Sequence, residues 1–337
     1  MARANHTDNR IRLGLLGFGY WGPNLARVVS EIKDAVLAYI IDAKEENRQR
    51  AKARYPNAIV SGDIEIALKD PDVQGILIAT PAKTHYELAK LSLEAGKDVF
   101  VEKPLALSYK EGQELVNLAK AKDRILMVGH LMLYHPAVLK MKEMLDKGEL
   151  GSLFYLFFQR LSLGRVRSDE NVLWSLAPHD ISMLLFLCQE TPSDIWARGG
   201  CFLQENIEDI VMVHIRFPSG VMADIQVSWL APHKLRQVLL VGDKKMLIFD
   251  DVESFEKLKV YEHSIDANSF FLAPPFIPRY GDIHSPYLPQ VEPLKEECLE
   301  FVRCIKTRQA PRTDGEEGLK VLQVLEAAQD SLKKGGF

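Results

Sequence analysis

A glycine-rich turn that directly follows the first apolar run constrains the fold of this chain more than any other feature. The run at residues 12–16, RLGLL, leads into GFGYWG, a GxGxxG pattern. In a dinucleotide-binding unit, such glycines allow a tight turn, close approach of a pyrophosphate and close packing of strand against helix. Backbone amides at the start of the next helix then face the phosphates. A lone GxGxxG also occurs in ordinary turns, so its context decides. The residues of this predicted phosphate turn are Gly17, Phe18, Gly19, Tyr20, Trp21 and Gly22.

An aspartate ends the second apolar run and supplies that context. Residues 35–41 read AVLAYII, and Asp42 follows them, twenty residues beyond Gly22. A carboxylate at this place accepts hydrogen bonds from the adenosine ribose hydroxyls. It also repels a 2'-phosphate, so the pattern predicts NAD rather than NADP as the cofactor. The alternative is an aspartate that only caps a helix or makes a turn.

The first 130 residues alternate short apolar runs with amphipathic segments, which is typical of strand, crossover helix and parallel strand. The runs are continuous in Val, Ile and Leu, as in strands that helices cover on both faces. We therefore predict an α/β fold whose residues 11–130 form an NAD-binding Rossmann domain with a doubly wound parallel sheet. Its predicted strands are 12–16, 35–41, 75–79, 98–101 and 125–128.

Beyond residue 130, predicted strands follow one another through short turns such as Pro218-Ser219-Gly220. Such turns favour antiparallel pairing. We expect residues 131–337 to form a substrate-binding and oligomerisation α/β domain with an open, mostly antiparallel sheet. Its predicted strands are 153–161, 194–201, 210–217, 221–228, 237–241 and 245–250, its predicted helices are 137–147, 179–188, 293–307 and 316–334, and the proline-rich residues 273–293 are predicted to form an irregular loop.

Length and composition exclude several classes of function. A chain of 337 residues with ordinary globular composition suits about two domains. Its 42 Lys and Arg against 46 Asp and Glu form no basic block, so we expect no nucleic-acid partner. The four cysteines form no CxxC pair, and no spacing suggests a metal site. The polar start MARANHTDNR and the lack of an 18-residue apolar run predict a cytoplasmic protein without membrane contact.

The predicted strand at 75–79 ends at the edge of the sheet where open parallel sheets bind ligands. Thr80 and Pro81 follow it, and His85 comes soon after. These three residues are predicted to border the cofactor. The alternative is that threonine and proline start a helix and that the histidine caps or packs there.

The strand at 98–101 reaches the same edge and is followed by Glu102, Lys103 and Pro104. Because proline fixes the backbone behind it, Lys103 is predicted to point over the nicotinamide crevice. Glu102 and Lys103 are therefore further predicted cofactor contacts. The alternative for Lys103 is a surface lysine at the end of a strand.

Four features together carry a family resemblance: GFGYWG, the strand-ending Asp42, ATPAKTHYELA and VFVEKPLALS. With them the chain resembles the glucose-fructose oxidoreductase / inositol dehydrogenase (Gfo/Idh/MocA) family of sugar and polyol dehydrogenases. The end of the chain, from EPLKEECLEF to AAQDSLKKG, is also similar to that family's C-terminal helices. The resemblance implies a Rossmann domain followed by an open-faced α/β domain, with substrate bound between them.

The resemblance implies two catalytic residues. The lysine of Glu-Lys-Pro lies in that family's active site and corresponds to Lys103. A helix of the second domain supplies a histidine, normally within Asp-x-Gly-x-His-x-x-Asp, which corresponds to His179 in SLAPHDIS. Ser175 and Ser182 stand at the two acidic positions, so the family's aspartate is not carried over. The alternative for His179 is packing or capping in a helix.

Oxidation of an alcohol needs one proton acceptor on the hydroxyl while hydride leaves the adjacent carbon for the nicotinamide. An ordinary imidazole, with a pKa of about 6.5, accepts a proton at neutral pH, so we assign this role to His179. Lys103 is predicted to hydrogen-bond the same oxygen and to stabilise its negative charge. The two roles are open to exchange.

Further polar residues are weaker candidates for contacts with substrate. His130 and Tyr134 are predicted to line the substrate cleft, Tyr280 to close over substrate, and the arginines to bind a substrate diphosphate. Core packing and solvated loops are the alternatives. These weaker candidates are His130, Tyr134, Arg160, Arg165, Asp180 and Tyr280.

The segments LWSLAPHDISMLL and IRFPSGVMADIQVSWLAPHK are most similar to the nucleotide-sugar branch of that family. This implies NAD-dependent oxidation of the 3-hydroxyl of a UDP-N-acetylhexosamine such as UDP-N-acetylglucosamine. The alternatives are an inositol or free-sugar dehydrogenase and, from another class, a non-catalytic NAD-binding regulatory protein. The strand VMADIQVSWL leaves one partly apolar side for a subunit contact, which predicts a homodimer or homotetramer.

Overall fold

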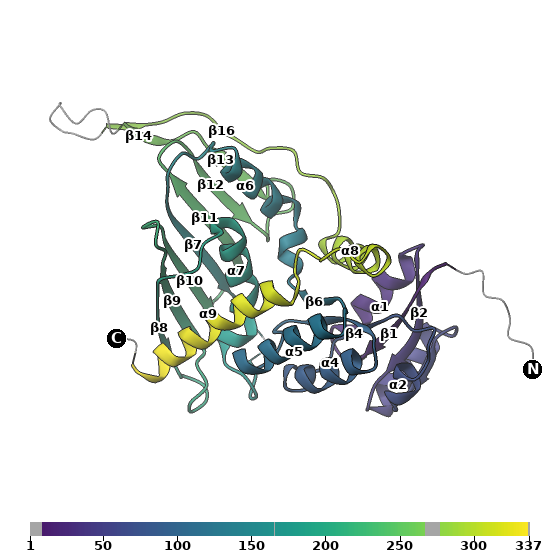
Figure 1. The fold of residues 1–337 in the computed structure, drawn as a ribbon. Coiled ribbons are helices and arrows are strands. Elements are labelled where there is room, and N and C mark those ends of the chain that lie inside the picture. The colour runs from purple at the N-terminus through teal and green to yellow at the C-terminus, as the bar shows by residue number, and fades with distance from the viewer. Residues whose placement is uncertain (1–8, 165, 267–276, 336–337) are drawn as a thin grey trace, which may run out of the picture. The chain divides into compact units, whose positions relative to one another are not determined.

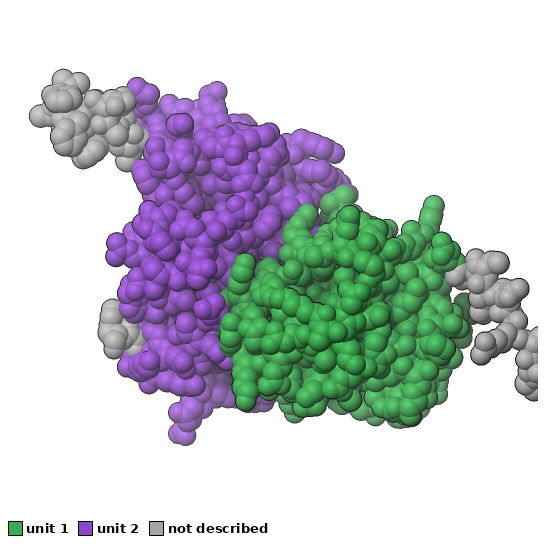
Figure 2. Space-filling view, in the orientation of Figure 1, with its two compact units in different colours: residues 1–131, 291–322 green, residues 132–290, 323–337 purple. Residues whose placement is uncertain are grey.

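The computed structural model describes residues 9–164, 166–266 and 277–335, which divide into two compact units (Figure 1). Unit 1 comprises the described part of Met1–Leu131 together with Val291–Leu322. Unit 2 comprises the described part of Met132–Gln290 and of Gln323–Phe337, as coloured in Figure 2. The chain passes from unit 1 to unit 2 a second time within helix α9 (Gly315–Lys333).

The described part of unit 1 contains a six-stranded parallel sheet in the order β3-β2-β1-β4-β5-β6. This is the doubly wound Rossmann order, and it reverses between β1 and β4. Every residue of β4, β5 and β6 is buried, which explains the apolar sequences of β4 and β6 and the apolar centre of β5 between Asp98 and Glu102, and confirms the predicted fold class. The strands are β1 (Ile11–Leu16), β2 (Ala35–Ile41), β3 (Ile59–Ser61), β4 (Gly75–Ile78), β5 (Asp98–Glu102) and β6 (Leu126–Gly129).

Helices connect and cover these strands (Figure 1). The connecting helices are α1 (Gly22–Glu31), α2 (Glu45–Arg54), α3 (Glu65–Leu68), α4 (His85–Glu94) and α5 (Tyr109–Ala121). Helix α5 begins where the Ser108 side chain accepts the backbone N–H of Glu111 at 3.2 Å, a typical N-cap.

Helix α8 (Pro293–Thr307) also packs in unit 1, whereas the sequence analysis assigned it to the second domain. The rings of Phe301 and Phe100 meet edge to face at 5.9 Å, which joins α8 to β5. Arg308 donates to Asp98 Oδ2 at 2.7 Å and ties the end of α8 to the same strand. Hydrophobic periodicity predicts that a helix has a buried face but does not say which sheet covers it.

The described part of unit 2 contains an eight-stranded sheet in the order β16-β13-β12-β11-β7-β10-β9-β8. Its neighbouring strands are antiparallel apart from β7 and β10, so the prediction of a mostly antiparallel sheet is confirmed. The strands are β7 (Leu153–Leu161), β8 (Asp194–Gly200), β9 (Ile210–Arg216), β10 (Met222–Ser228), β11 (Leu235–Gly242), β12 (Met246–Asp250), β13 (Leu258–Tyr261) and β16 (Ile283–His284).

The two faces of this sheet differ. Helix α7 (Val172–Cys188) packs on β7, β9 and β10 and buries one face, on which Leu156, Phe158 and Ile225 lie. The alternating residues of the other face include Tyr155, Trp196, Met212 and Met222, which are between 38% and 57% exposed. Helix α6 (Pro136–Asp146) packs against α7 and β12.

Two local predictions in unit 2 were wrong. Helix α7 begins at Val172 and not near His179, because the Asn171 side chain caps it by accepting the Trp174 N–H at 3.2 Å. Pro178 lies inside the helix, where a proline normally signals a boundary. The described part of residues 273–293 contains short strands, β15 (Ile277–Arg279), which pairs with β14 (Ser264–Asp266), and β16.

None of the helices in the described ranges is both long and apolar enough to cross a bilayer.

Candidate active site

The glycine turn lies between β1 and α1, at the carboxyl edge of the parallel sheet. Gly17 has a φ of +92°, a conformation that favours glycine, and a Cβ there would lie 2.7 Å from the Ala79 carbonyl oxygen. A Cβ on Gly22 would collide with the Gly17 carbonyl oxygen, so this glycine allows the close packing of turn and helix. Gly19 faces open space, which leaves room for a ligand to approach the backbone.

The aromatic residues of the turn take different roles. Phe18 is buried, and its ring packs edge to face against Tyr55 at 5.9 Å. Tyr20 is 82% exposed. Trp21 directs its indole Nε1 to Glu102 Oε1 at 2.5 Å, which links the turn to the end of β5.

Asp42 stands at the end of β2 and connects the second strand to the glycine turn. Its Oδ2 accepts the Phe18 backbone N–H at 2.7 Å and the Asn47 side-chain amide at 3.1 Å. Its Oδ1 accepts the Lys44 N–H at 2.8 Å. A carboxylate has about four acceptor positions, so this partly exposed group retains capacity for a ribose hydroxyl. The glycine turn and this carboxylate together fit a dinucleotide.

His85 joins two loops of the carboxyl edge. Its ring is buried, with Nδ1 2.7 Å from the Pro104 carbonyl oxygen and Nε2 2.9 Å from the Thr80 carbonyl oxygen. Burial lowers the pKa of His85, so the neutral ring has one N–H to donate to these two carbonyl groups. Thr80 also accepts a hydrogen bond from the Thr84 hydroxyl at 2.7 Å, while Pro81 precedes a single turn of 3-10 helix, Ala82–Thr84.

Glu102 and Lys103 end β5 at this edge. The side chain of Glu102 covers Gly129 of the neighbouring strand, where a Cβ would lie 2.9 Å from the Glu102 Oε2. Burial raises the pKa of Glu102 to about 7, although the nearby Lys103 ammonium and the Trp21 indole act to lower it. The Lys103 charge also contributes to the lowered pKa of His85, which places the ammonium near both groups. The Lys103–Pro104 peptide bond is cis.

His130 and Tyr134 are both buried, His130 in unit 1 and Tyr134 in unit 2. The Nδ1 of His130 lies 2.6 Å from Glu317 Oε2 in the first turn of α9. The sequence analysis did not identify Glu317, because it stands among the polar residues that usually begin a helix. Contact of His130 or Tyr134 with substrate stays a prediction.

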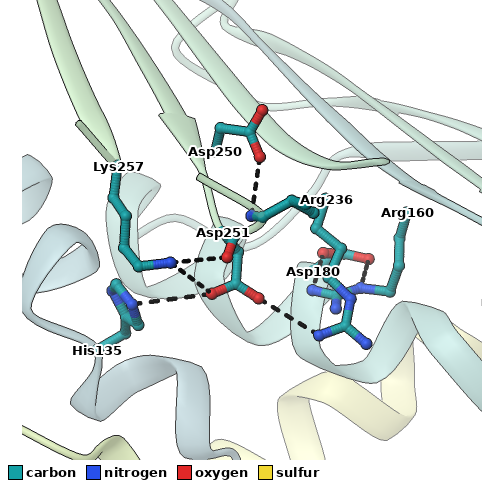
Figure 3. A network of polar contacts seen from close by, with 8 residues as sticks. His135, Arg160, Asp180, Arg236, Asp250, Asp251 and Lys257 are labelled. Carbon is teal, nitrogen blue, oxygen red and sulfur yellow. Dashed lines mark hydrogen bonds and ion pairs between the residues drawn. The ribbon is translucent and has the colours of Figure 1, made fainter. Parts of the chain in front are cut away.

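In unit 2, His179 lies on α7 and is partly exposed, and its carbonyl accepts the Ser182 hydroxyl at 2.9 Å. The next residue, Asp180, forms a bidentate ion pair with Arg160 of β7 (Figure 3). Arg160 Nε and Nη2 lie 2.9 and 2.8 Å from the two carboxylate oxygens, and both side chains are buried. Burial alone would lower the pKa of Arg160, but the charge and hydrogen bonds of Asp180 raise it. The pair therefore joins α7 to the sheet beside His179, and a substrate contact by either member stays a prediction.

A second carboxylate, Asp251, lies next to this pair and is surrounded by basic side chains (Figure 3). Its side chain lies 3.4 Å from Arg236 Nη1 and 3.9 Å from both Lys257 Nζ and His135 Nε2. His135 accepts the Ala137 N–H at 3.1 Å and thereby caps α6. Burial lowers the pKa of His135, so its role in the structure is that of a neutral cap.

The remaining predicted residues lie elsewhere. Arg165 falls outside the described residues. Tyr280 is 83% exposed, and its ring meets His263 edge to face at 5.5 Å. In the described ranges, no group of three or more His, Cys, Asp or Glu side chains is arranged to hold a metal ion.

Unit 1 thus brings together, along one sheet edge, most of the residues predicted to contact the cofactor. Unit 2 holds His179 beside the buried ion pair. The convergence of Lys103 and His179 on one substrate oxygen stays a prediction.

Glu297 of α8 is a buried carboxyl that the sequence analysis missed, and it predicts a pH-dependent stability. Its side chain is fully buried, and burial raises its pKa well above the ordinary value. Above the ordinary carboxyl pKa, the folded state therefore binds more protons than the unfolded state, and the free energy of unfolding falls as pH rises. We expect Glu297→Gln to remove up to about 1.4 kcal/mol per pH unit of this fall, as measured by urea unfolding between about pH 6 and 8.

The matched control is Glu87→Gln on the exposed surface of α4. We expect this variant to keep the wild-type dependence of stability on pH. If the stability of Glu297→Gln depends on pH as strongly as that of the wild type, Glu297 ionises in the folded protein as it does in the unfolded chain.

Family models match both parts of the chain. Residues 11–130 match the model described as oxidoreductase family, NAD-binding Rossmann fold, and residues 138–248 match the GFO/IDH/MocA C-terminal domain. Myo-inositol 2-dehydrogenase from Thermotoga maritima is 27% identical over 334 residues, covering 96% of this chain and 97% of that protein. UDP-N-acetylglucosamine 3-dehydrogenase from Acidithiobacillus ferrooxidans is 25% identical over 314 residues, covering 93% of this chain and 94% of that protein.

Solved structures share the fold. The UDP-N-acetylglucosamine 3-dehydrogenase of Acidithiobacillus ferrooxidans superposes with a TM-score of 0.81 at 22% identity, covering 97% of this chain and 98% of that one. Levoglucosan dehydrogenase, solved in complex with NADH, superposes with a TM-score of 0.82 at 20% identity, covering 97% and 98%.

Proposed function

This chain belongs to the Gfo/Idh/MocA family of NAD-binding oxidoreductases, and from that premise we propose that it is a cytoplasmic dehydrogenase of nucleotide sugars. The proposed reaction is oxidation of a secondary hydroxyl to a ketone, most specifically the 3-hydroxyl of a UDP-N-acetylhexosamine such as UDP-N-acetylglucosamine. One observation carries it: Lys103 stands at the carboxyl edge of β5, next to a glycine turn and an Asp42 that fit NAD.

The residues divide the chemistry between them. When bound, NAD supplies the hydride acceptor. His179 accepts the proton of the substrate hydroxyl, and Lys103 hydrogen-bonds the same oxygen and stabilises its negative charge. The buried His85 ring lies between the Thr80 and Pro104 carbonyl oxygens, so its single N–H helps to hold the loop after β4 against Pro104, the residue that follows Lys103.

The choice of substrate rests on the similarity to UDP-N-acetylglucosamine 3-dehydrogenase and on the sequence segments of the second domain. It is tested by incubating the protein and NAD with a panel of UDP-N-acetylhexosamines, free sugars and inositols while following the absorbance of NADH. We expect turnover with UDP-N-acetylglucosamine. Turnover with inositols alone would support the second candidate, an inositol dehydrogenase, which the similarity to myo-inositol 2-dehydrogenase favours.

Asp42 predicts a preference for NAD over NADP. Its carboxylate is partly exposed at the end of β2 and repels a 2'-phosphate. We expect Asp42→Asn to raise the ratio of NADP to NAD affinity at least about tenfold, which corresponds to about 1.4 kcal/mol. Titration of both cofactors checks this, with Asp72→Asn on the surface of the same unit as control. Equal ratios in the wild type and Asp42→Asn would contradict the repulsion.

The half-exposed, partly apolar face of the second sheet supports a homodimer or homotetramer. Tyr155 and Met222 are adjacent on β7 and β10, and Met212 lies on the next strand. Exposed apolar side chains of this kind on an open sheet favour contact with a second copy. Light scattering that shows a monomer at working concentration would remove this part of the proposal.

A further inference from the structure

Glu102 joins the glycine turn to the end of β5 that precedes Lys103. It is the last residue of β5, and its buried side chain accepts the Trp21 indole N–H at 2.5 Å. It also accepts a hydrogen bond from the Lys103 backbone. One side chain therefore contacts both the turn that fits a dinucleotide and the residue predicted to act on the substrate.

The contact with Glu102 takes the place of an ordinary cap at the start of α1. Trp21 stands at the N-cap of this helix, and its side chain makes no capping hydrogen bond. Serine, threonine, aspartate or asparagine would accept a backbone N–H of the first turn there. An indole is a donor only, so Trp21 does not compete with a phosphate for those N–H groups. The turn is held from outside, through Glu102.

The groups that contact Glu102 favour its carboxylate form. Burial raises its pKa to about 7, while the Lys103 ammonium, the Trp21 indole, the Lys103 backbone and His130 all act to lower it. Each of these groups is a cation or a hydrogen-bond donor. Above about pH 8, Glu102 is therefore mainly a carboxylate, one negative charge next to the Lys103 ammonium.

The other titratable groups around this pair carry no charge that replaces Glu102. Glu297 and Cys298 face Glu102 from α8, and burial raises the pKa of both well above the ordinary values, so both are neutral. His85 of α4 faces Lys103, and burial lowers its pKa, so its ring is neutral as well. Glu102 is thus the negative charge that balances the ammonium.

We propose that Glu102 is a positioning residue whose carboxylate holds the glycine turn through Trp21 and keeps Lys103 in its ammonium form. The proposal rests on the proposed function, in which Lys103 hydrogen-bonds the substrate oxygen beside bound NAD⁺. The positive nicotinamide ring of NAD⁺ opposes a second positive charge nearby, and the carboxylate of Glu102 offsets this repulsion.

This assignment decides between the two roles that the sequence leaves open to exchange. A lysine that stays charged donates hydrogen bonds and has no free electron pair to accept a proton. The substrate alcohol then gives its hydride to the nicotinamide and its hydroxyl proton to His179, while Lys103 keeps its own protons.

Titration of NAD⁺ into the full-length protein tests the hold on the turn without any sugar. Trp21→Phe keeps an aromatic ring and removes the N–H, so we expect NAD⁺ affinity to fall about tenfold with the loss of a hydrogen bond to a charged group. Glu102→Gln keeps an oxygen that accepts the indole N–H, so its affinity should stay within about twofold of the wild type. Trp196→Phe in unit 2 is the control. Wild-type affinity in Trp21→Phe overturns this part of the inference.

The pH profile of kcat/KM tests the effect of the charge. In Glu102→Gln the ammonium lacks its negative neighbour, so the fall of activity at alkaline pH should begin at least about one pH unit lower than in the wild type. Trp21→Phe keeps the carboxylate and should keep the wild-type profile, as should the surface variant Glu87→Gln. A merely structural Glu102 would lower activity by the same factor at every pH.

The two proposals fail in different ways. An alkaline limb in Glu102→Gln that coincides with the wild-type limb overturns the charge role and leaves the proposed function standing. Absence of turnover with every sugar and inositol, or failure of the wild type to bind NAD⁺, contradicts the proposed function itself.

Discussion

Replacing Lys103 with alanine is expected to lower the turnover number with the sugar substrate by at least about 100-fold while NAD affinity stays nearly unchanged. The reason is position: Lys103 follows the last residue of β5 at the carboxyl edge, and its ammonium acts on both Glu102 and His85. The dinucleotide is held by the glycine turn and Asp42, which the substitution leaves in place. Steady-state kinetics and a separate NAD titration measure the two effects.

The roles of Lys103 and His179 are separated by comparing their variants. We expect His179→Ala to lower the turnover number by a similar factor. The double variant should lower it by less than the product of the two single factors, because the residues act on one oxygen. The residue that serves as proton acceptor is the one whose loss removes the rise of turnover with pH. Lys83→Ala, an exposed position of unit 1, is the control. Full turnover in both single variants would contradict the assignment of Lys103 and His179 as the catalytic residues.

The parallel sheet was predictable because strands buried on both faces have nearly continuous apolar sequences. Strands β4 and β5 are buried along their whole length, and each is an unbroken or nearly unbroken apolar run. The predicted position of Asp42 followed from its spacing to the glycine turn, and the structure adds that its carboxylate accepts the Phe18 N–H. Short edge strands such as β3 and β16 were not predicted, because two or three residues carry no periodicity.

The buried polar groups were harder to predict, because their partners are far apart in the sequence. Asp180 and Arg160 meet only because α7 packs on β7. Glu297 stands in the segment KEECLE, which reads as a solvated helix face. A signal was present, since Glu297 follows Leu294 by three residues and precedes Phe301 by four, and these positions share one helix face. A charged residue in a buried helical stripe is a reason to look for a special environment.

Breaking the ion pair between Arg160 and Asp180 is expected to destabilise unit 2 by about 3–5 kcal/mol. Asp180→Asn removes the carboxylate charge that both Arg160 donors contact within 2.9 Å, and so leaves the buried guanidinium without its paired charge. Urea unfolding followed by tryptophan fluorescence measures the loss, since Trp174, Trp196 and Trp229 all lie in unit 2.

The expected loss of stability in Asp180→Asn arises from the unpaired charge of Arg160 and not from the loss of a favourable contact. Two controls distinguish these causes. Arg160→Met combined with Asp180→Leu removes both charges, so most of the stability should return. Glu256→Gln breaks the exposed pair with Lys259, whose atoms are 3.1 Å apart, and should cost less than about 1 kcal/mol because water screens that pair. A loss in Asp180→Asn no larger than in Glu256→Gln would mean that water reaches Arg160.

Asp180 is next to His179 on α7, so the ion pair also bears on the proposed reaction. We expect Asp180→Asn to lower turnover under conditions in which the variant is folded. The double apolar variant is expected to recover stability without recovering all of that turnover.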